Sequence, residues 1–101
     1  MIERHWKGVA KTDRVNDYIA HLKNETFPGI EKIGGFVRAS ILNREVDGGV
    51  EFLIITVWES LEAIRHFAGD RIELAVVPAH AQAMMVDFDR HVSHYNVQFQ
   101  I

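Results

Sequence analysis

Four stretches of the chain have the length and hydrophobic pattern of β-strands. The first covers 2–9 and the second covers 36–46. Asp47-Gly48-Gly49 is typical of a hairpin turn, because tight hairpin turns need positive φ angles that glycine adopts freely. This turn returns the chain into a third strand over 51–58. A last strand is predicted over 92–101, where every second residue of the C-terminal half is apolar.

Helical segments fill the gaps between these strands, and the first and third repeat their apolar residues every three or four positions. The first is expected to end at Pro28-Gly29, because proline cannot continue a helix and glycine accepts its exit. The second runs from Ser60, a favourable N-cap, to Gly69. The third begins at Pro78, and its apolar stripe extends to Phe88.

The order β-α-β-β-α-α-β is that of the ferredoxin-like fold with one additional helix before the last strand. We therefore predict an α+β fold with a four-stranded antiparallel sheet and all helices on one face. No linker, repeat or low-complexity segment divides the chain, so residues 1–101 are predicted to form a single domain.

The third strand is apolar on both sides, which predicts a partner. Phe52, Ile54 and Trp58 point to one face, and Leu53, Ile55 and Val57 point to the other. One layer of helices covers only one face of a sheet, and a bare apolar face would leave an exposed patch of several hundred Å². A second copy of the sheet would cover it, giving a homodimer. The alternative is that a central strand is apolar simply because it is buried.

Composition excludes several classes of function. The chain of 101 residues is 48% hydrophobic and 25% charged, which is ordinary for a globular protein. It has no cysteine, so disulfides, thiolate nucleophiles and iron–sulfur clusters are excluded. The net charge is −3 and no two lysines or arginines are adjacent, which argues against nucleic-acid and anionic-membrane binding. No signal peptide or membrane span is recognisable, so we expect a cytoplasmic protein.

Two of the six histidines are candidate catalytic residues. His80 lies on the flank of the third helical stripe, from which it can reach the space between helix and sheet. His94 lies on the polar face of the last strand. Each can equally be a hydrogen-bonded structural residue. Helical phase places His21 and His66 on solvent-facing sides of their helices, and no pair of histidines has a spacing typical of a metal site.

The first strand carries more charge than a central strand normally does. Arg4, His5 and Lys7 flank Trp6, and burying such groups without partners costs several kcal/mol each. These side chains therefore lie either at a solvated rim or around a cavity.

Several motifs together resemble one known family. Trp58-Glu59-Ser60 directly follows the long apolar strand, Pro28-Gly29 precedes Gly35-Phe36, and Phe67-Ala68 lies near the end of the second helix. In these features the chain resembles, over nearly its whole length, the antibiotic biosynthesis monooxygenase-like domains of the dimeric α/β-barrel superfamily. The resemblance is specific for the fold and much less so for the reaction.

The resemblance implies a cofactor-independent monooxygenase that oxidises a small aromatic or polycyclic substrate with O₂. Such an enzyme removes a proton from the substrate and stabilises the carbanion, which reacts directly with O₂. His80, and less directly His94, would be the catalytic residues. The substrate pocket would be formed by Trp6, Arg38, Trp58, Phe67 and Met84, with Arg38 stabilising the anion.

Haem binding and degradation is the alternative that the resemblance also implies. Those relatives use a histidine on the segment after the second helix, a tryptophan near the end of that helix and an asparagine on the first strand. Here His80 is on the corresponding segment, Phe67 takes the place of the tryptophan, and the first strand has no asparagine. A third possibility is a dimer that binds a small ligand without turnover.

Overall fold

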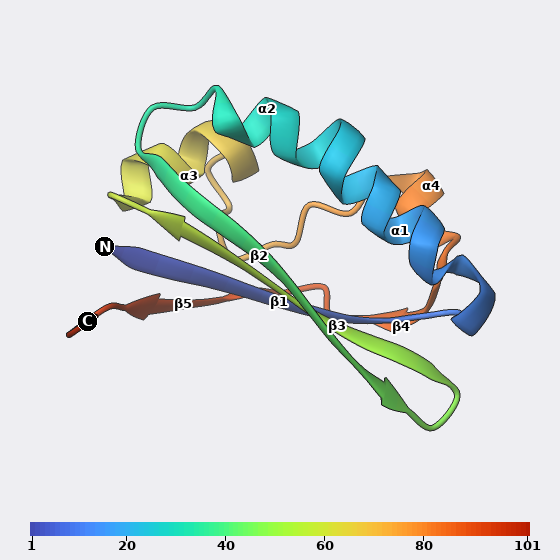
Figure 1. The fold of residues 1–101 in the computed structure, drawn as a ribbon. Helices are drawn as coiled ribbons and strands as arrows, with labels where there is room; N and C mark the ends of the chain where they lie inside the picture. Colours follow the sequence, from blue (N-terminus) through green and yellow to red (C-terminus); the bar gives the residue numbers. More distant parts are fainter.

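The computed structural model describes residues 1–101 and consists of one antiparallel sheet with its helices on one face (Figure 1). The strands are β1 (Ile2–Ala10), β2 (Phe36–Val46), β3 (Gly49–Trp58), β4 (Met85–Phe88) and β5 (Ser93–Asn96). The helices are α1 (Val15–His21), α2 (Phe27–Glu31), α3 (Leu61–Ala68) and α4 (Ala79–Gln82), with a 3-10 helix η1 (Thr12–Arg14) before α1 and a π-helical turn η2 (Leu22–Thr26) joining α1 to α2. None of the helices is long and apolar enough to cross a membrane. The predicted α+β, ferredoxin-like architecture is confirmed.

β1 lies in the middle of the sheet, whose order is β2-β3-β1-β4, with β5 also paired to β1. On one side β1 pairs with β3 along its whole length, from Ile2 opposite Trp58 to Ala10 opposite Val50. On the other side its C-terminal part pairs with β4 and its N-terminal part with β5. The sheet therefore has five strands where four were predicted, because two short strands share one edge.

The third predicted helix is wrong beyond its first turn. α4 ends at Gln82, and Met85–Phe88 form β4 instead of a continuing helix. The apolar residues of this segment have helical spacing, but the backbone groups of β1 from Gly8 to Ala10 need hydrogen-bond partners on this side. β4 supplies those partners, and this tertiary requirement overrides the local pattern.

β5 is likewise shorter than the strand predicted over 92–101. Asn96 lies opposite Ile2, and the amide of Val97 donates a hydrogen bond to the carbonyl of Met1. Beyond this point the alternating tail pairs with no strand and leaves the sheet next to the N-terminus (Figure 1).

The sequence pattern predicted that the first helix ends at Pro28-Gly29, but the chain stays helical past these residues. In η2 the helix widens, and the amide of Phe27 donates to the carbonyl of Leu22, five residues earlier. A proline inside a regular helix lacks an N–H and its ring meets the carbonyl four residues before it. The wider turn relieves that clash, and the chain stays helical to Glu31.

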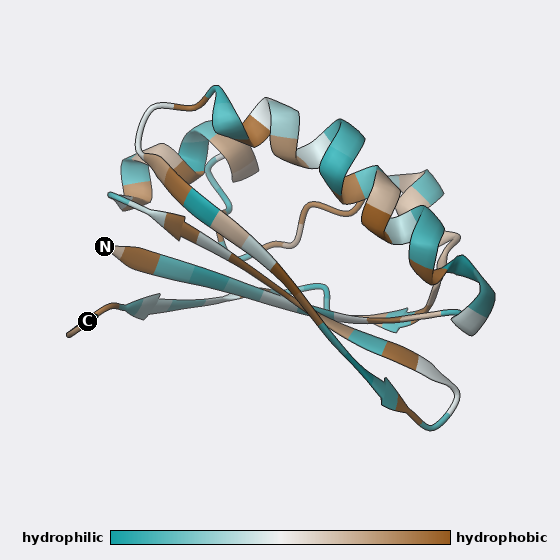
Figure 2. Cartoon of the chain, in the orientation of Figure 1, coloured by the Kyte–Doolittle hydropathy of each residue, from teal (hydrophilic) through white to brown (hydrophobic).

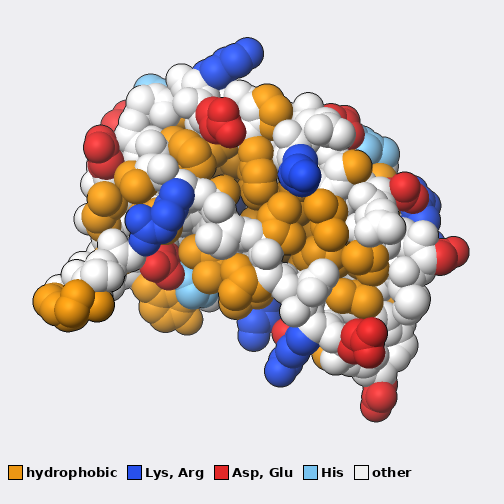
Figure 3. Space-filling view, viewed as in Figure 1, with side chains coloured by type: hydrophobic (Ala, Val, Ile, Leu, Met, Phe, Trp, Pro, Cys, Tyr) orange, Lys and Arg blue, Asp and Glu red, His pale blue; other side chains and the backbone are white.

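Hydrophobic residues recur along the strands and the helices (Figure 2), and hydrophobic side chains gather on the visible face between the helices and the sheet (Figure 3). The buried hydrophobic side chains form two clusters, one around Trp6 and Phe52 and the other around Trp58 and Ile64. Phe52, Ile54 and Trp58, which the sequence pattern placed together on one face of the strand, are all buried here.

The opposite face of the sheet has no helical cover (Figure 1). Leu53 and Ile55 of β3 are half-buried on this face, and Leu42, which lies opposite Leu53 on β2, is 44% exposed. His5 and Lys7 of β1 lie opposite Ile55 and Leu53, so charged and apolar side chains alternate across this surface.

Candidate active site

A cavity of about 60 Å³ lies between the sheet and the helices, and 11 of its 16 lining residues are hydrophobic. A space of this size holds roughly four to six water molecules. Aromatic side chains from four elements form much of its wall: Trp6 of β1, Tyr18 of α1, Phe27 of α2 and Phe67 of α3. The cavity thus suits a small apolar or aromatic molecule.

Arg4 of β1 brings a positive charge to this apolar cavity. It is 4% exposed, and its guanidinium donates to the carbonyls of Ile72 and Leu74 and to Nε2 of His94, 3.0 Å away. The guanidinium also lies 5.6 Å from the centre of the Phe67 ring. No carboxylate forms an ion pair with it.

Burial lowers the pKa of Arg4 to about 10, so the guanidinium remains charged at neutral pH. A buried cation without a counter-ion is costly to the fold, because several kcal/mol of hydration free energy are lost. The cavity therefore favours a ligand that carries or develops negative charge near Arg4.

His94 does not line the cavity but forms a hydrogen bond with the Arg4 guanidinium. An arginine can only donate hydrogen bonds, so Nε2 of His94 is the acceptor and the ring proton is on Nδ1. Burial lowers the pKa of His94, and the charge of Arg4 lowers it further. His94 is thus held neutral, which is the state that fixes the guanidinium in place.

A wider hollow of about 360 Å³ adjoins the cavity and shares its residues His21, Thr26 and Phe67. Glu25, His66 and His80 also line this mouth. The cavity is therefore reached from outside past the η2 turn and the start of α4.

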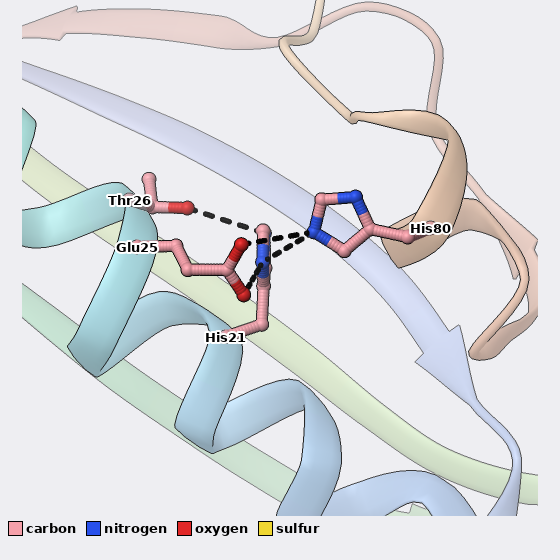
Figure 4. Close-up of polar contacts among 4 residues, drawn as sticks. All are labelled: His21, Glu25, Thr26 and His80. Carbon is pink, nitrogen blue, oxygen red and sulfur yellow. Dashed lines mark hydrogen bonds and ion pairs between the residues drawn. The ribbon is translucent and has the colours of Figure 1, made fainter.

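Three side chains at the mouth point toward one another (Figure 4). Nδ1 of His21 lies 3.2 Å from Oε2 of Glu25 and 3.1 Å from Nε2 of His80, and Nε2 of His80 lies 3.3 Å from Oε1 of Glu25. The hydroxyl of Thr26 lies 3.2 Å from the other ring nitrogen of His21. The hydrogen bond with His21 is the main cause that lowers the pKa of Glu25, so this carboxylate stays ionised.

The predicted exposure of His21 is wrong, because it is 5% exposed. Its ring stacks near Tyr18, with 6.1 Å between ring centres, and meets the His80 ring edge-on at 4.8 Å. His80 of α4 packs against the flank of α1 that the helical phase predicted to face solvent.

The other residues singled out from the sequence fall in different places. Trp6 and Phe67 line the cavity, and the side chain of His80 is 54% exposed at its mouth. Trp58 is fully buried in the second core cluster, and Met84 is buried in the first, outside the cavity lining. Arg38 is exposed on β2 and is not among the cavity residues, so the structure places Arg4 where the sequence interpretation had placed Arg38.

Sequence reasoning missed His21 and Glu25 as a pair. They are four residues apart, a spacing that places both on one face of a helix and that a histidine and a glutamate share with many ordinary surface pairs. The charged first strand left two interpretations open, and the structure realises both: Arg4 lines the cavity, whereas His5 and Lys7 lie on the outer face of the sheet.

No protein-family model and no curated protein matches the sequence. Solved structures do match the fold. A protein from Bacillus cereus, provisionally assigned as an antibiotic biosynthesis monooxygenase, is 23% identical and superposes with a TM-score of 0.69 over 100% of this chain and 94% of its own. The chain has the fold of the antibiotic biosynthesis monooxygenase-type proteins.

Two further structures with the monooxygenase-type fold differ in what they bind. SnoaB, a cofactor-independent oxygenase from Streptomyces nogalater, is 19% identical with a TM-score of 0.62, covering 99% of this chain and 94% of its own. A variant of MhuD, solved with two manganese protoporphyrin IX molecules in each active site, is 16% identical with a TM-score of 0.62, covering 100% and 98%. The shared fold is therefore compatible with both kinds of chemistry.

Proposed function

We propose that this protein is a monooxygenase that oxidises a small aromatic substrate with O₂ and needs no bound cofactor. The fold it shares with SnoaB supports this proposal. The observation that carries it is the buried guanidinium of Arg4, which faces an aromatic cavity without a carboxylate partner. Such a group stabilises a substrate anion in a medium where water cannot.

The proposed reaction converts an activated methylene next to aromatic rings into a carbonyl. A base removes one of its two hydrogens as a proton, and the carbanion adds O₂ to form a peroxide. Loss of water from the peroxide, which takes the second hydrogen, leaves the carbonyl. One oxygen atom of O₂ thus enters the product and the other leaves as water, so no external reductant is consumed.

Arg4 and His21 have complementary roles in this proposal. Arg4 holds the oxygen on which the negative charge of the carbanion is delocalised. His21 lines the cavity and accepts the proton. His80 and Glu25 contact His21 and are exposed, so they pass that proton to water.

The size of the cavity favours a small substrate. Its deep part, about 60 Å³, would take the edge of an aromatic ring, and the mouth would take what extends beyond it. A haem fits less well, because ligands of its size need several hundred Å³ of enclosed space. Nε2 of His80, the atom that would bind haem iron, is directed at His21 and Glu25.

We also propose that two copies pair through the outer face of the sheet. Leu42, Leu53 and Ile55 form a contiguous apolar group there, since Leu42 and Leu53 are direct neighbours across β2 and β3. Tyr95 of β5 is 57% exposed and its ring lies 4.9 Å from that of His5, on the same surface. A two-fold partner would cover these side chains without a new element of the fold.

Oxygen uptake tests the proposed activity. The purified protein is offered anthrones, which carry such a methylene, with no added cofactor, and the product is analysed for one oxygen atom from ¹⁸O₂. We expect uptake of one O₂ per substrate and a loss of about 100-fold or more in kcat for Arg4→Gln. Arg65→Gln, an exposed arginine on α3 paired with Glu62, is the matched control and should be unchanged.

If no substrate of the panel supports O₂ uptake by the folded protein, the proposed activity is wrong. A hemin titration separates the haem alternative: a stoichiometric Soret shift that His80→Ala abolishes would favour haem over the cofactor-independent reaction.

A further inference from the structure

We propose that His21, Glu25 and His80 form a binding site for a divalent first-row transition metal ion at the mouth of the cavity. All of their ligand atoms lie within 4.8 Å of one another. His21 and Glu25 are four residues apart on one helical segment, and His80 follows His21 by 59 positions. The tertiary fold therefore brings the three side chains together. This inference does not rest on the proposed oxygenase activity.

The separations between the facing atoms are close to those around a bound ion. Nδ1 of His21 and Nε2 of His80 are 3.1 Å apart, and each lies next to a different oxygen of Glu25, at 3.2 Å from Oε2 and 3.3 Å from Oε1 respectively. Ligands at about 2.1 Å from an ion are roughly 3.0 Å apart in an octahedral face and roughly 3.4 Å apart in a tetrahedron. The two imidazole nitrogens already have this spacing, and a small rotation of the exposed Glu25 carboxylate would complete the site.

Thr26 prepares His21 for this role. Its hydroxyl lies 3.2 Å from Nε2 of His21. In the metal-free protein Nδ1 of His21 donates to the ionised Glu25 (Figure 4). A metal ion on Nδ1 would displace that proton, and the Thr26 hydroxyl would then accept a proton carried by Nε2. Metal-bound histidines usually have such a partner on the second nitrogen, which fixes both the tautomer and the ring orientation.

The donor set determines which ions fit. Two imidazoles and one carboxylate suit Zn²⁺, Co²⁺ or Fe²⁺, whereas Mg²⁺ and Ca²⁺ prefer oxygen ligands. Glu25 and His80 have side chains 58% and 54% exposed, so an ion can enter from solvent. Three protein ligands also leave a coordination position open for water or for a ligand at the mouth.

The proposal is tested by titrating the full-length, tag-free, chelator-treated protein with ZnCl₂ by calorimetry and with CoCl₂ by visible absorbance. We expect one ion per chain and d–d bands typical of nitrogen and oxygen ligands. MgCl₂ should give no heat of binding. His80→Ala and Glu25→Gln should each weaken Zn²⁺ binding at least tenfold.

His66→Ala is the matched control, because His66 lines the same mouth but lies outside the cluster. It should bind Zn²⁺ as the unmodified protein does. Because Glu25 and His80 are exposed, both variants are expected to fold, and circular dichroism checks this. Zn²⁺ binding that is absent, or that survives in both variants, would overturn the proposal. Neither outcome bears on O₂ uptake by the metal-free protein, so failure here is distinct from failure of the proposed function.

Discussion

Gly8 provides a direct test of how the wall of the cavity is held. A Cβ built on Gly8 would overlap Cη2 of the Trp6 ring and stand 2.9 Å from its Cζ2, well inside the normal carbon–carbon contact of about 3.5–4.0 Å. The ring cannot easily retreat, because its Nε1 donates to the carbonyl of Asp89 at 2.8 Å. In Gly8→Ala the Trp6 ring must therefore move toward the cavity or lose this hydrogen bond.

The size of the effect follows from two opposing contributions. Overpacking a core costs about 1–3 kcal/mol, and replacing a strand glycine by alanine returns about 0.5–1 kcal/mol. We expect Gly8→Ala to lower the free energy of unfolding by about 1 kcal/mol, or roughly 4–8 °C in melting temperature for a domain of this size. The variant should also bind aromatic ligands more weakly, because the cavity narrows.

Thermal unfolding followed by circular dichroism and tryptophan fluorescence measures this effect. Gly34→Ala is the control, since a Cβ at Gly34 meets nothing within 4 Å and its φ lies outside the left-handed region. Its melting temperature should match that of the unmodified protein. An unchanged or higher melting temperature for Gly8→Ala, with unaltered ligand binding, would refute the packing described for Trp6.

Three further predictions concern the sheet, the pH dependence and the base. Leu53→Glu places a charge on the uncovered face and should shift the protein from dimer to monomer in analytical ultracentrifugation, whereas an unchanged dimer would exclude this face as the interface. The pKa of His94 in the folded protein is lowered from 6.5, so on acidification the unfolded chain binds this proton first, and neutral His94 stabilises the fold fully above about pH 6.5. This stabilisation is lost as the pH falls through the lower pKa of the folded state. Urea unfolding at a series of pH values should show the loss of stability, and in His94→Gln the loss should be smaller. His21→Asn should lower kcat for O₂ uptake about 100-fold or more, with His91→Asn, an exposed histidine, unchanged. Full activity in His21→Asn would remove this residue from the mechanism.

Much of the fold could be predicted from local signals. β2 begins and ends where the pattern predicted, Ser60 caps α3 through its hydroxyl at 3.1 Å, and Gly69 ends that helix with a positive φ of 80°. These features depend on neighbouring residues alone. The β4 strand does not, because it supplies hydrogen-bond partners to β1, which is far away in the sequence. The π-helical turn before Pro28 has a local cause, the clash of the proline ring, but a proline pattern predicts the end of a helix rather than a wider turn.

The candidate site was harder to predict for the same reason. Arg4 was recognised as unusual for a central strand, but its direction depends on the carbonyls of Ile72 and Leu74, almost seventy residues away. The burial of His21 depends on the segment before α4, whose path no periodicity specifies. Sequence pattern therefore identified the chemically unusual residues better than it identified their partners.

The central claim is that Arg4 stabilises a substrate anion inside the cavity, and the pKa of a bound phenol tests it most directly. At about 4 Å and an effective dielectric constant near 20, the guanidinium and a phenolate attract by roughly 4 kcal/mol, from which the cost of desolvating the phenolate is subtracted. A pH titration of a bound nitrophenol by absorbance should give a pKa at least about one unit below that of the free phenol, since one unit corresponds to about 1.4 kcal/mol. In Arg4→Gln the bound pKa should rise to or above the free value. The same bound pKa in both proteins would contradict the account.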